Sequence, residues 1–305
     1  MKTFKSILQF QKEFSSEEKC REQLELQRWN GTPACPFCGS LHVHRFATNN
    51  KIFKCKESVC RKKFSVTVGT IYENTKIPLT KWFLAHYILA VHSKGISSHQ
   101  LATMLDVTQK TAWFLNHRIR EMLTDKAPKL LHGIVEVDET YIGGKNKNKR
   151  KSKRVTGSQG GAGKTMVFGA IQREGKVIAK VVKDTTAETL IGEIKKNIET
   201  GSVMVSDENV SYNTVGQNYK HVTVSHGKEE YVRGAAHTNS IEGVWSLLKR
   251  QIVGIHHSVS PKHLQRYCNE STYRYNSKQL AQDERFAASL ANCEGRLKYQ
   301  DLINS

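Results

Sequence analysis

The sequence predicts a mixed α/β protein in which two small modules precede a larger α/β domain. Three observations lead to this prediction. Four of the seven cysteines lie between residues 35 and 60, hydrophobic residues recur at helical spacing over 75–130, and strand-like stretches followed by helices begin near residue 131. We therefore expect an N-terminal helix with a cysteine-rich module over residues 1–74, a helical module over 75–130 and the α/β domain over 131–305.

The composition points to a polyanionic partner. The chain has 305 residues and a formal net charge of +19, because 47 Lys and Arg residues outnumber 28 Asp and Glu residues. Such an excess most often accompanies binding to a polyphosphate chain, and a solubilising surface is the alternative. No run of about 18 apolar residues occurs, so we expect no membrane-spanning helix. The odd cysteine count and the absence of secretory-signal features favour a reducing cytoplasm.

The cysteine-rich module has the spacing of a zinc site. CPFC at 35–38 and CKESVC at 55–60 each place two thiolates at the ends of a tight turn. Two such turns complete a tetrahedral set of ligands for a structural Zn²⁺ ion. The alternating stretch between them predicts a β-hairpin, so this module is interpreted as a zinc ribbon. The expected zinc ligands are Cys35, Cys38, Cys55 and Cys60.

Two further features of this module bear on its role. His42 and His44 are expected to be surface or hairpin residues, since four cysteines already complete the site. Metal binding would supply the free energy of folding, while the basic residues at 61–63 supply positive charge beside the second cysteine pair. We expect Lys62 and Lys63 to contact DNA.

The helical module has the pattern of a helix-turn-helix. A short helix is expected over 97–105, a turn over 106–108 and a second helix from residue 109. We expect His117 and Arg120 to be exposed on that second helix, whose first turn is where base edges are usually contacted. The alternative is a helical hairpin that serves packing alone. The candidates for DNA contact are Gln109, Lys110, Thr111 and Arg118.

The α/β domain is expected to contain five strands. β-Branched residues predict the first of them in GIVEVDETYIGG. The expected strands cover 133–144, 164–173, 176–184, 202–208 and 221–226. The expected helices cover 186–200 and 238–252. Three antiparallel strands extended by crossover strands would give a mixed sheet flanked by helices.

Acidic residues occupy three separate elements of this domain. Asp138 lies among apolar residues in the first strand, where a carboxylate is costly unless it is hydrogen-bonded or binds a cation. Asp207 ends the fourth strand, and Glu242 lies on the late helix. Hard divalent cations such as Mg²⁺ prefer carboxylate oxygens, so these residues are candidates for a metal site.

Three motifs in this order resemble those of a known family. VDETYIGGK at 137–145, VSDENVSYN at 205–213 and HTNSIEGVWSLLKR at 237–250 are similar to motifs of the zinc-ribbon-bearing group of bacterial DDE transposases, the insertion-sequence relatives of the Merlin elements. The resemblance covers nearly the whole chain, including the zinc ribbon and RKKFSVTVGT at 61–70. It implies that the α/β domain is an RNase H-like catalytic core.

The resemblance also implies an activity. A protein of this kind is a DNA transposase that binds the ends of its insertion sequence, cleaves DNA and transfers the strand. Two Mg²⁺ or Mn²⁺ ions about 3.5–4 Å apart would serve the in-line displacement at phosphorus, with Asp138 and Asp207 bridging the pair. The expected partner is double-stranded DNA, at the transposon ends and at the target. Such enzymes act on two ends at once, so we expect a homodimer or larger oligomer on DNA.

The third active-site residue has two candidates on one face of the late helix. Glu242 follows Asp207 at the spacing that the resemblance implies. Asn239 lies one helical turn earlier and is the rival, because Asn or His stands at this position in some members of the group. Lys249 follows Glu242 by two turns, and we expect it to hold a phosphate of the transposon end.

Three glutamates flank the two aspartates. Glu136 and Glu139 belong to the first strand, and Glu208 follows Asp207 directly. If the strands are regular, these side chains point to the opposite face of the sheet. We therefore interpret the three glutamates as non-catalytic.

A basic stretch, KNKNKRKSKR at 145–154, opens an insertion loop that we place at 145–164. Lys149 and Arg150 are expected to lie on DNA phosphates, and a solvated segment is the alternative. The later GSQGGAGKT at 157–165 is not a phosphate-binding P-loop, since residue 158 is Ser where that pattern requires Gly, and a strand follows instead of a helix. ATP is therefore not an expected ligand.

Two other functions are compatible with parts of the sequence. A non-catalytic DNA-binding regulator would use the zinc ribbon and helix-turn-helix alone, but it would not require Asp138 and Asp207. An RNase H-type structure-specific nuclease would cut hybrids or branched DNA without end specificity and without joined products. The presence or absence of strand transfer separates both from a transposase.

Overall fold

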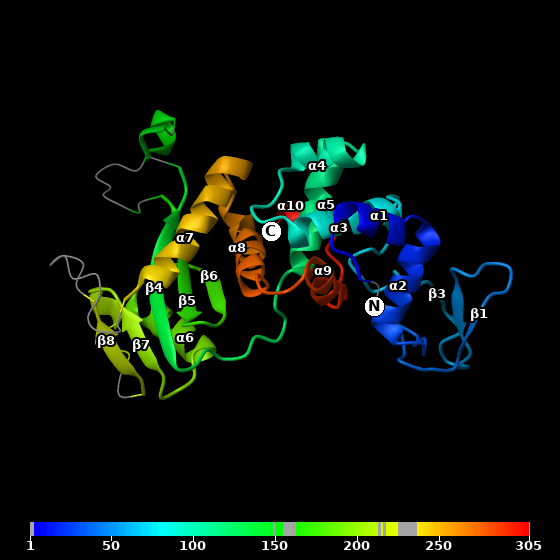
Figure 1. The fold of residues 1–305 in the computed structure, drawn as a ribbon, viewed down its shortest axis with the longest axis horizontal. Coiled ribbons are helices and arrows are strands. Elements are labelled where there is room, and N and C mark those ends of the chain that lie inside the picture. Colours follow the sequence, from blue (N-terminus) through cyan, green and yellow to red (C-terminus); the bar gives the residue numbers. More distant parts are fainter. Residues whose placement is uncertain are drawn as a thin grey trace. The chain divides into compact units, whose positions relative to one another are not determined.

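A computed structural model describes most of the chain and divides it into two compact units (Figure 1). One unit comprises residues 1–124 and 279–305, and the other comprises residues 125–278. Among the described residues, none of the helices has the length and the apolar character of a membrane span. Lys149, predicted to contact DNA, lies outside the described residues. The described residues are 3–144, 146–148, 150–154, 161, 163–212, 215, 218–224 and 237–304.

Two short helices open the first unit. They are α1 (Ile7–Glu13) and α2 (Glu17–Trp29). Each begins after a serine, Ser6 or Ser16, whose hydroxyl accepts a backbone N–H bond from the first turn. Asn30 ends α2 in a left-handed conformation, with a φ of 44°, which Asn tolerates better than most residues. The chain then turns directly into the cysteine-rich module.

The cysteine-rich module is a three-stranded antiparallel sheet. β1 (Val43–Arg45), β2 (Phe53–Cys55) and β3 (Lys63–Phe64) pair in that order, and β1 and β2 form the predicted hairpin. Its apolar core is small, with the Phe53 and Phe64 rings stacked at 5.5 Å and Trp29 edge-on to Phe53 at 5.1 Å. A core of this size needs a staple such as a metal ion.

The helical module contains three helices. They are α3 (Leu79–Val91), α4 (Ser98–Leu105) and α5 (Gln109–Met122). A capping box between Ser97 and Gln100 starts α4, and the Thr108 hydroxyl accepts a first-turn N–H bond at the start of α5. Only residues 106–108 separate α4 from α5. Both helices and the turn between them therefore lie where the sequence predicts them.

The C-terminal segment packs in the first unit, although we expected residues 279–305 to belong to the α/β domain. It contains α9 (Gln282–Leu290) and α10 (Tyr299–Asn304). The buried Phe286 ring on α9 lies 5.2 Å from that of Phe10 and 5.5 Å from that of Phe83, between centroids. The Ser289 hydroxyl oxygen lies 2.7 Å from Nε2 of His86 on α3. The apolar face of α9 thus completes the core of the first unit.

Removal of the Phe286 ring tests this packing. We expect Phe286→Ala to lower the free energy of unfolding of the first unit by about 3–5 kcal/mol, because it leaves a cavity in a packed aromatic cluster. Denaturant unfolding of the purified protein would measure the change. Leu280→Ala is the matched control, since Leu280 lies in the same segment but is 40% exposed. An unchanged free energy for Phe286→Ala would contradict the placement of α9.

The second unit contains a five-stranded mixed sheet. Its strands are β4 (Ile134–Ile142), β5 (Thr165–Gln172), β6 (Val177–Val182), β7 (Val203–Ser206) and β8 (Lys220–Thr223). Their order is β6-β5-β4-β7-β8, in which β4, β5 and β6 are antiparallel while β7 and β8 continue parallel to β4. This order and these directions are those of the RNase H-like fold. The predicted mixed α/β class is therefore confirmed.

Helices cover both faces of this sheet (Figure 1). They are α6 (Ala187–Asn197), α7 (Asn239–Gln251) and α8 (Leu264–Asn276). On one face, Leu190 of α6 shares an apolar core with Val135 of β4. On the other face, Trp245 of α7 shares a core with Val167 of β5. The side of β4 that turns away from α6 is therefore the side that meets α7.

Short turns complete the second unit. A π-helical stretch (Ile252–His256) and a 3₁₀ turn (Pro261–His263) connect α7 to α8. The basic insertion contains two 3₁₀ turns, Asn146–Asn148 and Lys151–Lys153. A further 3₁₀ turn, Val210–Tyr212, follows β7.

The strand register leaves an open position beside Asp138. β7 pairs with β4 only as far as Glu136, which faces Val205, and β7 ends at Ser206. β4 continues to Ile142 and remains paired with β5 over this stretch. Asp138 and the residue that follows β7, Asp207, therefore meet at the carboxyl end of a parallel strand, where ligands usually bind in such sheets.

Candidate functional site

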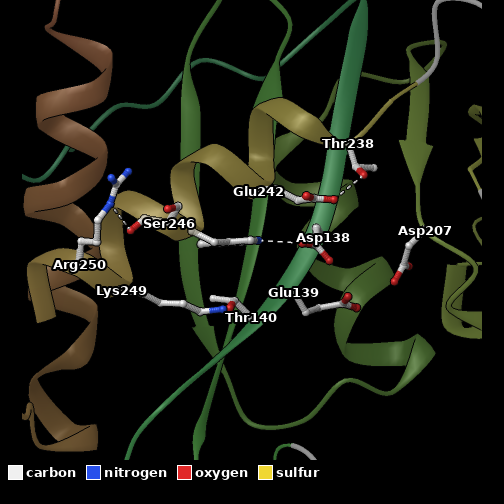
Figure 2. Close-up of a pocket in the computed structure, with 10 residues that line it drawn as sticks. Asp138, Glu139, Thr140, Asp207, Thr238, Glu242, Ser246, Lys249 and Arg250 are labelled. Carbon is white, nitrogen blue, oxygen red and sulfur yellow. Dashed lines mark hydrogen bonds between the residues drawn. The ribbon is translucent and has the colours of Figure 1, made fainter. Parts of the chain in front are cut away.

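A cavity of about 530 Å³ lies at this end of the sheet, between β4, α7 and the segment after β7. It brings together Asp138, Asp207 and Glu242, the three carboxylates predicted to form the catalytic site. Figure 2 shows their side chains around the same space. The lining residues are Asp138, Glu139, Thr140, Asp207, Thr238, Glu242, Trp245, Ser246, Lys249 and Arg250.

Hydrogen bonds orient each carboxylate. The indole Nε1–H of Trp245 donates to Oδ2 of Asp138 at 2.9 Å. The Thr238 hydroxyl donates to Oε1 of Glu242 at 3.2 Å, and Oδ1 of Asp207 accepts the backbone N–H of Asn209 at 3.1 Å. Each carboxylate is therefore held by a neighbour on its own element or on the element that faces it.

Trp245 is a site residue that the sequence analysis missed. Its ring lies against Gly169 of β5, which is the register partner of Asp138. A Cβ at residue 169 would lie 2.4 Å from the ring, so only glycine admits the indole at this position. A glycine inside a strand often marks such a close approach, and this was the available signal.

The cavity is lined by more carboxylates than basic side chains. Burial raises the pKa of Asp138 to about 6, and repulsion by Asp207 and Glu242 adds to the shift. Burial also raises the pKa of Glu139 to about 7, with further repulsion from the two aspartates. A divalent cation would offset this repulsion, and carboxylate oxygens are the donors that a hard cation prefers. The residues present therefore fit such an ion.

Glu139 lines the cavity, which its predicted position on the opposite face of the sheet did not lead us to expect. Its side chain starts on the α6 side of β4, and its Oε1 accepts a bond from Nδ2 of Asn209 at 3.3 Å. The physical reason is that β7 ends at Ser206, so no β7 residue pairs with Glu139. A side chain on the α6 side of β4 can then reach around this edge.

The predicted orientation of Glu136 is wrong. Residues two apart on a strand share a face, so Glu136 points to the same side as Asp138. It does not line the cavity, and its carboxylate instead accepts bonds from the first turn of α7. Glu208 is exposed and lies outside the cavity lining.

The two candidates for the third carboxylate position differ in placement. Glu242 lines the cavity. Asn239 is the first residue of α7, is exposed and is absent from the lining. Lys249 lines the cavity as well, together with Arg250, which the sequence analysis did not single out. The geometry therefore favours Glu242 as the third carboxylate. Arg250 adds a second basic side chain to the cavity beside Lys249.

The four predicted zinc ligands lie together. Their sulfur atoms are within 4.8 Å of one another, and in the described residues this is the only group of metal-ligating side chains gathered so closely. Sγ of Cys35 lies 3.8 Å from that of Cys60, and Sγ of Cys38 lies 3.6 Å from that of Cys55. Both cysteine pairs thus face each other as a tetrahedral Zn²⁺ site requires. His42 and His44 are not part of this group.

Most predicted DNA contacts lie on exposed positions. The Nζ atoms of Lys62 and Lys63 lie 4.7 and 5.2 Å from the ring centroids of Phe37 and Phe46. Gln109 donates to the Ser98 hydroxyl at 2.8 Å, linking α5 to α4. The exposed predicted contacts are Lys62, Lys63, Gln109, Lys110, Arg150 and Lys249, and Thr111 is partly exposed.

The exposure predicted for Arg118 is wrong. Arg118 is only 5% exposed, its guanidinium lies between the rings of Trp82 and Phe114, and its Nη2 donates to the Glu73 carbonyl at 3.1 Å. Burial lowers its pKa to about 10. His117 and Arg120 are buried too. These three side chains lie on the part of α5 that faces the core. Arg118 is therefore not part of a surface that is open to DNA.

Comparisons with known proteins agree with this architecture. Residues 15–63 match the family model of a transposase zinc-ribbon domain, and residues 130–276 match that of an ISXO2-like transposase domain. An uncharacterized protein in transposable element ISH50 of Halobacterium salinarum is 30% identical over 273 residues, which cover 84% of this chain and 90% of that protein.

Two solved structures were also similar. The pre-cleavage Mos1 transpososome shares 14% identity over 66% of this chain and 75% of that chain, with a TM-score of 0.25. The Mos1 strand transfer complex shares 13% identity over 71% of this chain and 79% of that chain, with a TM-score of 0.26.

Proposed function

Because the chain belongs to the family of ISXO2-like transposases with an N-terminal zinc ribbon, we propose that it binds the ends of its insertion sequence, cleaves DNA there and transfers the released strand to a target. Its proposed partner is double-stranded DNA, in the cytoplasm. A protein that joins two ends must hold both, so the proposed active form is a homodimer or larger oligomer on DNA.

The observation that carries this proposal is the cavity with carboxylates from three separate elements. Asp138, Asp207 and Glu242 would hold Mg²⁺ or Mn²⁺, because these ions prefer carboxylate oxygens. When bound, such ions activate the attacking oxygen and stabilise the leaving oxygen in a displacement at phosphorus. Glu139 adds a fourth carboxylate to the same cavity.

The remaining residues of the cavity would orient the carboxylates and bind DNA. Trp245 fixes Asp138 through its indole N–H, and Thr238 fixes Glu242 through its hydroxyl. Lys249 and Arg250 lie further along α7 and would contact phosphates of the transposon end. The carboxylates of the cavity would thus hold the metal cations, and its basic side chains would hold the phosphodiester close to them.

The first unit would provide recognition of the transposon end. Zn²⁺ bound by the four cysteines would hold the ribbon folded, with Lys62 and Lys63 exposed beside it. The first turn of α5 would meet base edges through Gln109, Lys110 and Thr111. Arg150 in the basic insertion would add a phosphate contact in the second unit.

A strand-transfer assay tests the proposed function. The full-length protein is incubated with labelled DNA from the element's ends, a supercoiled target plasmid and Mg²⁺ or Mn²⁺. The expected products are nicked ends and end DNA joined to the plasmid. Tight binding without products would indicate a regulator, and cleavage of branched DNA or hybrids without joining would indicate a structure-specific nuclease.

Substitutions on α7 test the choice of the third carboxylate. We expect Glu242→Gln to slow strand transfer by about 100-fold or more, because it removes a metal ligand without changing side-chain size. Asn239→Ala is the matched control in the first turn of the same helix, and its rate should stay close to that of wild type. Both are compared at equal occupancy of end DNA. Retained activity in Glu242→Gln would transfer the role to Asn239.

A further inference from the structure

A buried carboxylate outside the cavity joins β4 to α7. Glu136 is 0% exposed. Its Oε2 accepts the backbone N–H groups of Ser240 at 3.0 Å and of Ile241 at 3.2 Å, and its Oε1 accepts the Ser240 hydroxyl at 3.0 Å. Nε of Arg173 and Nδ1 of His237 each lie 3.3 Å from the same Oε1. A residue of β4 thus accepts the hydrogen bonds that the first turn of α7 donates.

This contact replaces the usual helix cap. The first N–H groups of a helix have no partner within the helix, and a side chain at the N-cap normally accepts from them. Thr238 is the N-cap of α7 but makes no such bond, because its hydroxyl donates to Glu242. Glu136 accepts in its place, and its negative charge suits the positive end of the helix dipole. The first turn of α7 is therefore bound to β4.

A second bond sets how α7 lies along the strand. Asp138 follows Glu136 by two residues, which is about 6.6 Å along a strand. Trp245, which donates to Asp138, follows Ile241 by four residues, which is about 6 Å along a helix. The two spacings match, so both bonds form together. Glu242 lies between these two attachment points and is held opposite Asp138 (Figure 2).

We propose that Glu136 is a positioning residue for the proposed reaction. It fixes the first turn of α7 against β4, so that Glu242 is presented to the same cavity as Asp138. The inference rests on the proposed function. The guanidinium of Arg173 lies beside the carboxylate and offsets the cost of burying it. Because Glu136 lines no part of the cavity, it would act through α7 and not as a ligand.

The test compares Glu136→Gln with Glu270→Gln in the full-length protein. Glu270 is an equally buried carboxylate of the same unit, paired with Arg274 on α8 and absent from the cavity. We expect Glu136→Gln to slow strand transfer by about 10–100-fold at saturating end DNA, and to weaken Mn²⁺ binding by a similar factor, as loss of residues behind a metal site does. Affinity for end DNA should be unchanged. Glu270→Gln should keep both the rate and the Mn²⁺ affinity.

Two outcomes would overturn the inference. One is a wild-type rate and Mn²⁺ affinity in Glu136→Gln, and the other is an equal loss in Glu270→Gln, which would indicate a general effect on stability. If wild type itself gives no joined products, the proposed function fails, while calorimetric Mn²⁺ binding to both variants still tests the role of Glu136.

A milder variant covers the case in which Glu136→Gln does not fold. Ser240→Ala removes only the hydroxyl donor and leaves both backbone donors in place. We expect a fall of roughly threefold to tenfold in the strand-transfer rate with the melting temperature and DNA affinity unchanged. A wild-type rate in Ser240→Ala together with an unfolded Glu136→Gln would assign Glu136 to stability alone.

Discussion

Replacement of Asp207 by alanine is expected to lower strand transfer by about 10³-fold or more. Metal-ion catalysis supplies several kcal/mol of transition-state stabilisation, and each factor of ten in rate corresponds to about 1.4 kcal/mol. Asp207 follows β7 directly and shares a cavity with Asp138 and Glu242. The Asp207→Ala variant would keep the other carboxylates of the cavity but would lack the metal ligand that follows β7.

The neighbouring residue offers a matched control for this experiment. Glu208 is also acidic, is exposed and does not line the cavity, so Glu208→Ala should keep the wild-type rate. Mobility shift with labelled end DNA would establish that both variants bind equally. Joined products from Asp207→Ala, or the same loss in Glu208→Ala, would contradict the assignment of Asp207 to the metal site.

Replacement of Cys35 by serine is expected to release the zinc and unfold the ribbon. Structural Zn²⁺ contributes about 10–16 kcal/mol of apparent binding free energy in small zinc domains. The ribbon has few apolar contacts to offset that loss, since its core consists mainly of Phe53 and Phe64 with Trp29 against them. The bound zinc should fall from one ion per chain to none, and binding of end DNA should weaken.

Elemental analysis of the purified protein measures this outcome. Cys268→Ser is the control, because Cys268 is a buried thiol of the other unit and lies outside the group of four. It should keep its zinc. The second unit should still melt cooperatively in Cys35→Ser, since its sheet has a separate core. An unchanged zinc content in Cys35→Ser would show that the ribbon cysteines are not the zinc ligands.

The elements that the sequence predicted best are those with strong local signals. The two cysteine pairs, the capped turn between α4 and α5, and the β-branched strands each depend on residues that are close together in the chain. Asp138 lies within a strand and Asp207 directly follows one, and the family resemblance assigned both to one active site. The local pattern was enough for the cysteine pairs, the capped turn and the strands, because the residues that determine each of them are neighbours in the chain.

The features that were missed depend on partners distant in sequence. Trp245 of α7 reaches the site only because Gly169 of β5 has no side chain and leaves room for the ring. Glu139 turned into the cavity because β7 stops early, which no residue near Glu139 indicates. Glu136 is different, since the two-residue period of a strand already places it on the side of Asp138. Arg118 shows that a charged residue can lie inward when aromatic rings cover it.

The return of α9 to the first unit affects the order in which the protein matures during synthesis. Chains usually fold from the N-terminus as they leave the ribosome. Here the aromatic cluster around Phe10 and Phe83 lacks a member until Phe286 has been translated, whereas the whole of the second unit has been made by residue 278. The part of the gene read first thus encodes the unit completed last. A ribosome that stops before Phe286 releases a polypeptide with all the strands of the sheet but an unfinished first unit.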